Sequence, residues 1–351
     1  MSGEDDFNPV CPAPLSDYEE ITLAHGDGGA LTHKLIEQIM LPAFANDFLN
    51  QQHDGAVFGI NGTHLAFTTD SYVVRPYCVP GGESGMLAVN GTVNGLARGG
   101  ARPVGLSAGI ILEEGLPMAD LRRVVASMQK AAQEAGVQFV TGDTKVVDKG
   151  SGDGIFINVA GIGMVEAKQP ISPARVKSGD VVILSGDIGK HGMAVMSARE
   201  GLEFEHPIES DTAALHSAAL ALIEAGIDVH CLRDPTRGGL ATSLVEVAEV
   251  TKARIVIDEA TVPVSDTVRG ACEILGFDPL YVANDGRFIA FVAPVEQERA
   301  LEVLHAFDVC RNACVIGVVT ESACGIVTAK TAIGGQRVLD MLSGAQLPRI
   351  C

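Results

Sequence analysis

The sequence predicts two α/β domains in one chain, and three observations lead to this fold class. The chain has 351 residues, which is more than one ordinary hydrophobic core accommodates and suits two. In both halves, short apolar runs typical of strands alternate with longer segments of helical period. The alternation breaks once, in AKQPISPARVKSGD at 167–180, which carries two prolines and no period. We therefore predict an N-terminal α/β domain over 21–168 and a C-terminal α/β domain over 169–335.

The first half shows three helical segments and four strand-like runs. A helix near Gly29 carries apolar residues at helical spacing until Pro42 interrupts it. The segment SGMLAVNGTVNGLARGG at 84–100 is dense in small residues, which favours a closely packed helix. Pro117 begins an amphipathic helix that ends at Gly136. Apolar segments predict strands at 64–70, 105–112, 137–145 and 155–164. The strand at 137–145 is expected to lead into a polar turn.

The second half repeats the alternation without repeating the sequence. An apolar strand enters a glycine-rich turn in VVILSGDIGKHG at 181–192. Further strands are expected at 254–258, 287–294 and 314–320. Helices are expected at 191–200, 211–226, 237–251, 265–275 and 296–306. Neither half has a pure doubly wound rhythm, so the predicted class is α/β with α+β character.

Both ends of the chain differ from this pattern. Residues 1–20 are acidic and proline-rich, which predicts a flexible N-terminal extension. Residues 336–351 are expected to form a mobile tail that ends in the motif PRIC. Gly344 and Pro348 allow this tail to extend, and Arg349 favours the thiolate of the terminal Cys351. The sequence therefore predicts a mobile C-terminal segment with a reactive thiol at its last residue.

Composition excludes several classes of partner. The net charge of −19, the absence of Trp and the 5% aromatic content argue against nucleic acid and anionic membrane surfaces as partners. The eight cysteines form no CxxC pair, so they predict neither a zinc site nor a disulfide framework. The N-terminus MSGEDDFNPV has no apolar core of the kind that a signal peptide requires. We expect a cytoplasmic protein.

Acidic residues recur beside glycines and small residues near the ends of expected strands. They are Asp54, Asp70, Asp143, Asp234 and Asp285. Each one alone is ordinary turn chemistry. Together they are consistent with a cleft for Mg²⁺ and a nucleotide, because Mg²⁺ takes one or two carboxylates and completes its shell with phosphate oxygens. Lys145 and Arg237 offer cations for the phosphates, although the chain has neither GxxxxGK[ST] nor a strand-to-helix GxGxxG.

Six motifs together carry a family resemblance. They are LAHGDGG, TTDSYVVRPYCVPGG, ILEEGLPM, VTGDTKVV, RDPTRGG and the terminal PRIC. In order and spacing, from about residue 21 to the end, they resemble the HypE family of [NiFe]-hydrogenase maturation factors. That family belongs to a superfamily with aminoimidazole ribonucleotide synthetase, selenophosphate synthetase and thiamine monophosphate kinase. The resemblance implies a two-domain aminoimidazole ribonucleotide synthetase-like fold with a flexible C-terminal tail.

The resemblance also implies an activity and partners. HypF places a carbamoyl group on the terminal cysteine, and the HypE protein uses ATP to dehydrate the resulting thiocarboxamide to a thiocyanate. The cyanide group then passes to iron held by the HypC–HypD complex. The N-terminal domains pair in a homodimer, and ATP with Mg²⁺ binds in a cleft near that interface.

Roles follow the matched motifs. The resemblance implies catalytic roles for Cys351, Lys145, Asp285 and Asn284. It implies that the nucleotide is bound by Asp54, Asp70, Asn94, Gly142, Asp143, Thr144 and Arg237. Asp54 and Asp234 are the expected metal ligands.

This chain departs from the family pattern at three positions. His53 stands where the family usually has an acid, Gly95 stands where the family has an acid that helps to hold Mg–ATP, and Asp285 replaces a glutamate. Two alternatives therefore stay open beside a carbamoyl dehydratase. One is a superfamily kinase or synthetase that acts on a free small molecule, and the other is a maturation scaffold that does not turn over ATP.

Overall fold

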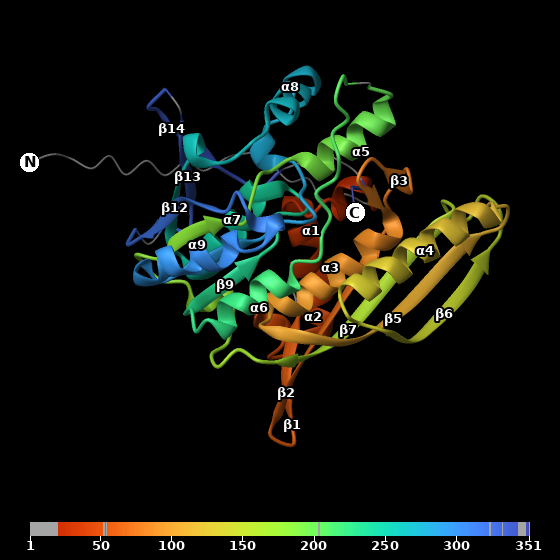
Figure 1. Cartoon of the computed structure of the whole chain (residues 1–351), viewed down its shortest axis with the longest axis horizontal. Coiled ribbons are helices and arrows are strands. Elements are labelled where there is room, and N and C mark those ends of the chain that lie inside the picture. Colours follow the sequence, from red (N-terminus) through yellow and green to blue (C-terminus); the bar gives the residue numbers. More distant parts are fainter. Residues whose placement is uncertain are drawn as a thin grey trace, which may run out of the picture.

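The first domain is a five-stranded sheet with two helices on one face (Figure 1). The computed structural model describes residues 20–51, 53, 55–202, 204–322, 324–331, 333–342 and 349–350. The sheet order is β1 (Ala56–Ile60), β2 (Thr63–Tyr72), β7 (Ile155–Val165), β5 (Ala101–Glu113) and β6 (Phe139–Val147). Only the β5–β6 pair is parallel. Helices α3 (Ser84–Arg98) and α4 (Met118–Glu134) bury their apolar faces against β5 and β7. A small hairpin joins β3 (Cys78–Val79) to β4 (Gly82–Glu83).

The opposite face of this sheet carries exposed apolar side chains. Phe67 pairs with Ile162 across β2 and β7, and these two are each 42% exposed. Ile111 and Met164 are 43% and 50% exposed. Ala66, next to Phe67 in β2, and Ile157, at the opposite alternation from Ile162 in β7, are buried toward the helices, as strand alternation requires. One face of the sheet is therefore left without a helical layer at these positions.

The second domain is a seven-stranded sheet between two helical layers. Its order is β14 (Gln336–Leu339), β13 (Val327–Lys330), β10 (Arg254–Asp258), β12 (Cys314–Thr320), β8 (Val181–Leu184), β11 (Ile289–Val292) and β9 (Val229–Arg233). Helix α7 (Gly239–Thr251) packs on one face. Helices α6 (His216–Glu224) and α9 (Gln297–His305) pack on the other. Successive residues of β8 alternate between these two cores, so the apolar run VVIL serves both.

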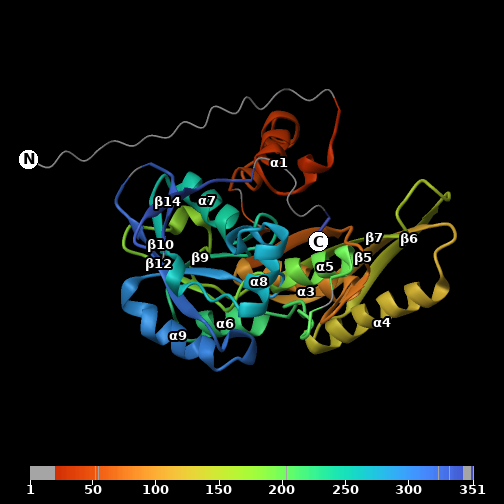
Figure 2. The ribbon, with the colours of Figure 1, turned by 90° about the horizontal axis from the view of Figure 1, so that it is seen from above.

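Two helices of the second half of the chain pack at the interface between the domains. Residues of α5 (Lys190–Glu200) and α8 (Asp266–Leu275) share one hydrophobic cluster with α3 and the first sheet. Helix α3 also packs against α6. Figure 2 shows α3 and α5 between the two sheets. The short helical turns are η1 (Leu23–Gly26), η3 (Leu49–Gln51), η4 (Pro173–Arg175), η5 (Glu259–Thr261), η6 (Pro279–Tyr281), η7 (Pro294–Glu296) and η8 (Asp308–Cys310).

The N-terminal helix differs from its prediction. It consists of α1 (Ala30–Leu35), a π-helical turn η2 (Ile36–Met40) and α2 (Leu41–Phe44). The helical conformation therefore continues past Pro42, where the sequence predicted an interruption. The π turn ends two residues before Pro42, which has no N–H for an α-helical bond. Only Leu31 is buried in α1, and Ile39 is 59% exposed. The apolar stripe expected to face a core is therefore largely on the surface.

Two further predictions are corrected by the strands. The TGDTK segment lies inside β6 and not in a turn, because it pairs in parallel with β5. Residues 336–339, expected at the start of a mobile tail, form β14 and pair with β13. The expected helices at 84–100, after Pro117 and in the second half are confirmed as α3 to α9, within a few residues at their ends. Strands β1, β3, β4, β9, β13 and β14 were not predicted; the proposed domain limits themselves stay a prediction.

No helix in the described ranges combines the length and the apolar character that crossing a membrane would need.

Candidate active site

Two adjoining cavities form a polar cleft between the domains. Their volumes are about 280 and about 500 Å³. The residues that line both are Thr69, Asp70, Arg98, Asp234, Thr236 and Arg237. The smaller cavity also reaches Asp285. Four residues predicted for the site, Asp70, Asp234, Asp285 and Arg237, therefore converge here from distant parts of the sequence.

The loop between β9 and α7 places Asp234 and Arg237. Gly238 and Gly239 both have positive φ, +72° and +64°, and a Cβ on Gly239 would lie 2.6 Å from the Leu280 carbonyl oxygen. Only glycine fits this turn without strain, which explains the RGG motif. The Thr236 hydroxyl donates to Asp234 Oδ2 at 3.0 Å and fixes that carboxylate.

The glycine-rich loop at 25–29 covers Arg237. Arg237 Nη1 donates to the Gly26 carbonyl at 3.2 Å. A Cβ on Gly28, which has φ +75°, would lie 2.7 Å from the Arg237 Cβ. The HGDGG motif therefore supplies close backbone packing over a cleft-lining arginine, and Gly28 also lines the larger cavity.

Asp285 is a buried carboxyl at the cleft wall. It is 7% exposed, and within the described ranges its Oδ2 has no hydrogen-bond partner. Burial raises the pKa of Asp285 to about 6, against the opposing influence of His191 and a hydrogen bond from Thr212. A carboxyl group with such a pKa exchanges a proton near neutral pH, as a general base requires.

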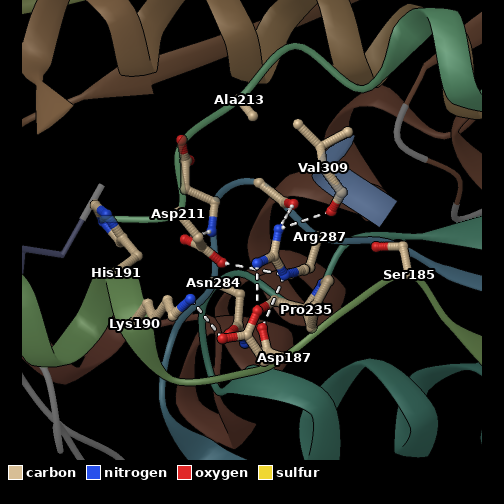
Figure 3. A network of polar contacts seen from close by, with 12 residues as sticks. Ser185, Asp187, Lys190, His191, Asp211, Ala213, Pro235, Asn284, Arg287 and Val309 are labelled. Carbon is tan, nitrogen blue, oxygen red and sulfur yellow. Dashed lines mark hydrogen bonds and ion pairs between the residues drawn. The ribbon is translucent and has the colours of Figure 1, made fainter. Parts of the chain in front are cut away.

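A network of buried polar groups holds the Asp285 loop in place (Figure 3). Arg287 donates to Asp187 Oδ1 at 2.6 Å and lies 3.8 Å from Asp211 Oδ2. Asp211 Oδ1 in turn accepts the Asp285 backbone N–H at 3.1 Å. Lys190 completes the network with an ion pair to Asp187 at 2.6 Å. Since these groups come from three separate loops, the network fixes the loops relative to one another.

Asn284 and Asn94 lie beside the cleft and do not line it. Asn284 is fully buried; its amide accepts from the Gly189 N–H at 2.6 Å and donates to the Pro235 and Val282 carbonyls. Asn94 donates to the Ala213 carbonyl at 2.9 Å and accepts from the Leu215 N–H at 2.7 Å. Both side chains tie loops together, so the geometry gives them a positioning role.

The last described residues, Arg349 and Ile350, are docked against the body. Ile350 is 2% exposed and belongs to the hydrophobic cluster that α5 shares with the first sheet. The Arg349 guanidinium donates twice to the Val73 carbonyl, at 3.1 and 2.8 Å, and pairs with Asp153. Arg199 donates to the Arg349 carbonyl. In this structure Arg349 and Ile350 thus have a specific binding site on the body of the protein.

His191 links this binding site of Ile350 to the Asp285 loop. Its Nε2 lies 2.9 Å from the Ile350 carbonyl oxygen, which can only accept, so Nε2 carries a proton. Its Nδ1 lies 2.9 Å from the Ser210 hydroxyl, which accepts from the Thr212 N–H and can donate to the ring. His191 is 1% exposed, and sequence reasoning gave it no role because a lone histidine in GKHG has no distinguishing signal.

The TGDTK residues lie far from the cleft of their own chain. Gly142, Asp143, Thr144 and Lys145 are on β6, the edge strand, and Figure 1 shows this edge pointing away from the second domain. Strands β7 and β5 separate β6 from β2, so the two backbones are about 14 Å apart at a spacing of about 4.8 Å per strand. Lys145 Nζ lies 2.5 Å from Asp143 Oδ1, and this contact lowers the pKa of Asp143.

Two predicted site residues, Asp54 and Cys351, lie outside the described residues, so their roles stay predictions. Sequence reasoning also missed Thr69, Arg98 and Thr236, which line both cavities. Arg98 had no motif to mark it, whereas Thr236 stood inside RDPTRGG between two predicted residues.

The donor set fits a metal ion that arrives with phosphate oxygens. Across the described part of the chain, no group of three or more His, Cys, Asp or Glu side chains gathers as a complete metal site. The smaller cavity nevertheless has three carboxylates in its lining, those of Asp70, Asp234 and Asp285. One or two carboxylates completed by phosphate and water are the usual Mg²⁺ arrangement in nucleotide sites.

Comparison with known proteins places the chain in a family. Residues 52–165 match the AIR synthase related protein N-terminal domain, and residues 177–330 match the corresponding C-terminal domain. The chain is 47% identical to carbamoyl dehydratase HypE of Azotobacter vinelandii over 331 residues, 94% of this chain and 97% of that protein.

Solved structures agree. A crystal structure of hydrogenase maturation protein HypE in complex with ATP is 46% identical, with a TM-score of 0.80 over 94% of this chain and 100% of that one. HypE in a HypE–HypF complex is 44% identical, with a TM-score of 0.83 over 88% of this chain and 99% of that one. The chain therefore belongs to the AIR synthase related family and, within it, to the HypE carbamoyl dehydratases.

Proposed function

We propose that this protein uses ATP to dehydrate a carbamoyl group on its own Cys351 to a thiocyanate, which supplies cyanide for the iron of a [NiFe]-hydrogenase. The observation that carries this proposal is the docking of Ile350: its backbone carbonyl is held by His191, which also opposes the rise in the pKa of the cleft carboxyl Asp285. Solved relatives in complex with ATP and with HypF support the nucleotide and the carbamoyl donor.

The chemistry needs an activated oxygen and a base. A carboxamide oxygen is a poor leaving group, so transfer of the ATP γ-phosphoryl group to it, with release of ADP, converts it to a phosphate ester. Loss of that phosphate and of the two nitrogen protons leaves S–C≡N, and the sum is the removal of one water. Asp285 is the group that we propose accepts a proton, because its pKa of about 6 leaves it ionised yet basic above neutral pH.

The remaining cleft residues bind and orient. Arg237 and the backbone of loop 25–29 are suited to phosphate oxygens. Mg²⁺, when bound, would screen the phosphate charge, and we propose Asp54 and Asp234 as its ligands with Asp70 beside them. Asn284 and the Arg287 network keep Asp285 at a fixed position in the wall.

We also propose a homodimer that pairs the first domains. The exposed apolar residues of the first sheet, among them Phe67 and Ile162, need a partner surface, and a second copy offers the same surface in return. Such a pairing explains why Lys145 is so far from its own cleft: it would act in the cleft of the partner copy. HypC–HypD as cyanide acceptor and a cytoplasmic location complete the proposal.

The whole proposal is tested by mass spectrometry of the C-terminal peptide. Incubation with HypF, carbamoyl phosphate and ATP should add one carbamoyl mass to Cys351, and Mg–ATP should then remove the mass of one water. A small-molecule kinase would consume ATP without this mass change, and a scaffold would retain the carbamoyl adduct unchanged.

A prediction concerns the docking of Ile350. Ile350→Asp should release the end of the chain, because burial of an isoleucine side chain contributes about 1.5–3 kcal/mol and a carboxylate would lose it. Carboxypeptidase should then trim the C-terminus about ten-fold faster or more. Ile333→Asp, at a residue that is 96% exposed, is the matched control and should leave trimming unchanged. Equal trimming of the native chain and Ile350→Asp would show that burial of Ile350 does not protect the C-terminus.

A further inference from the structure

Arg98 is a buried cation in the wall of the cleft. It is the last residue of α3, is 8% exposed, and lines both cavities. Its Nη2 lies 3.4 Å from Asp234 Oδ1, so the guanidinium is held against the cleft by a carboxylate of the β9–α7 loop. An arginine keeps its charge at any physiological pH, and its planar group matches phosphate oxygens.

The residue one turn earlier, Gly95, determines what Arg98 faces. A Cβ at Gly95 would lie 3.7 Å from Arg98 Nη2 and 3.2 Å from the Thr68 side chain. A carboxylate at this position would therefore reach the guanidinium and neutralise it. Helix α3 has no acidic residue anywhere along its length, so the helix presents Arg98 to the cleft without such a counter-charge of its own.

We propose that Arg98 binds the polyphosphate of the nucleotide directly and supplies positive charge that a metal ion would otherwise bring. This inference rests on the proposed function, since it needs a nucleotide in the cleft. Arg98 and Arg237 both line the two cavities, so phosphate oxygens between them would meet a cation from each domain. Nucleotide binding by this chain should accordingly depend only weakly on Mg²⁺.

The simpler role for Arg98 is that of a structural partner of Asp234. Its place in the last turn of α3 also stabilises the helix dipole. Both roles predict some loss of thermal stability on substitution. Only phosphate binding predicts a selective loss of nucleotide affinity when no metal is present.

The experiment is calorimetric titration of the full chain with a non-hydrolysable ATP analogue, in excess Mg²⁺ and in EDTA. The native chain should bind in both, with a Kd less than ten-fold weaker in EDTA. Arg98→Met should weaken binding in EDTA by about 10- to 100-fold, the usual effect of losing a charged hydrogen bond, and should recover part of that loss in Mg²⁺. Arg102→Met removes a surface arginine paired with Glu166 outside the cleft and should change neither value.

A second pair of variants keeps Arg98 and changes only residue 95 beside it. Gly95→Asp should weaken binding in EDTA and restore it in Mg²⁺, which makes the site metal-dependent. Gly95→Ala adds the same Cβ beside Thr68 without charge and should bind as the native chain does.

The outcomes separate the two proposals. If the native chain binds no nucleotide even in Mg²⁺, the proposed function fails and this inference fails with it. If it binds in Mg²⁺ but not in EDTA, or if folded Arg98→Met binds in EDTA like the native chain, the proposed function stands and Arg98 is only the partner of Asp234.

Discussion

Asp285→Asn is expected to stop dehydration while leaving carbamoylation of Cys351 intact. The substitution keeps the size of the side chain and removes its ability to accept a proton, and loss of a general base costs about 10²- to 10⁴-fold in rate. The C-terminal peptide should therefore accumulate with the carbamoyl mass and not lose water. Because HypF is proposed to perform the first step, an intact first adduct would also show that Cys351 is still accessible to HypF.

The pH dependence gives an independent check. The pKa of Asp285 is raised from 3.8 to about 6, mainly by burial, so the native dehydration rate should fall about ten-fold per pH unit below about 6. The same shift means that the folded state binds this proton more tightly than the unfolded state. Proton binding by Asp285 therefore makes its full contribution to the free energy of unfolding below a pH of about 4, and this contribution is lost as the pH rises through about 6.

Stability then separates a catalytic loss from a folding defect. Since the ionised carboxyl is unfavourable in its buried position, Asp285→Asn should melt no lower than the native chain at pH 8. Asp258→Asn, at a partly exposed acid on β10 that lies outside the cleft, is the matched control and should retain the native dehydration rate. Full dehydration by Asp285→Asn would assign the base to another group.

Local patterns predicted those parts of the site that local chemistry determines. The RGG turn needs two left-handed glycines, so it could be recognised from sequence, and it carries Asp234 and Arg237 with it. The amphipathic helices α4 and α8 could also be predicted from sequence, because their 3.6-residue period, the start of α4 after Pro117 and the end of α8 at Gly276 are local signals.

Long-range pairing determined what the sequence did not show. Asp143 resembled a turn acid beside a glycine, yet the parallel ladder with β5 makes it part of an edge strand. Ile350 resembled a mobile terminus, yet the cluster around α5 buries it. Arg98 lies in the cleft because the fold brings the end of α3 next to the loop after β9. Nothing within α3 indicates that its carboxylate partner is Asp234, 136 positions later.

Mixing two inactive variants is expected to restore activity, because the proposed dimer divides each catalytic cleft between two copies. Lys145→Ala should be inactive, since Lys145 is expected to act on the carbamoyl group or its phosphate, and Asp285→Asn should be inactive for the reason given above. In a mixed dimer, the cleft of the Lys145→Ala copy retains its own Asp285 and receives Lys145 from its partner. The other cleft of that dimer carries both defects.

The expected yield follows from random pairing. Equal amounts of the two variants, unfolded and refolded together, should form mixed dimers as about half of all dimers, each with one intact cleft, which gives about a quarter of the native dehydration rate. If Lys145 served its own cleft, every copy in the mixture would carry one defect and the rate would stay at zero. Refolding each variant alone provides the baseline, and Ile162→Glu, which places a charge on the exposed sheet face, should prevent both dimerisation and rescue. Rescue would therefore place Lys145 beside Asp285 of the partner copy and not beside Asp285 of its own chain, in keeping with the position of β6 at the sheet edge, about 14 Å from β2.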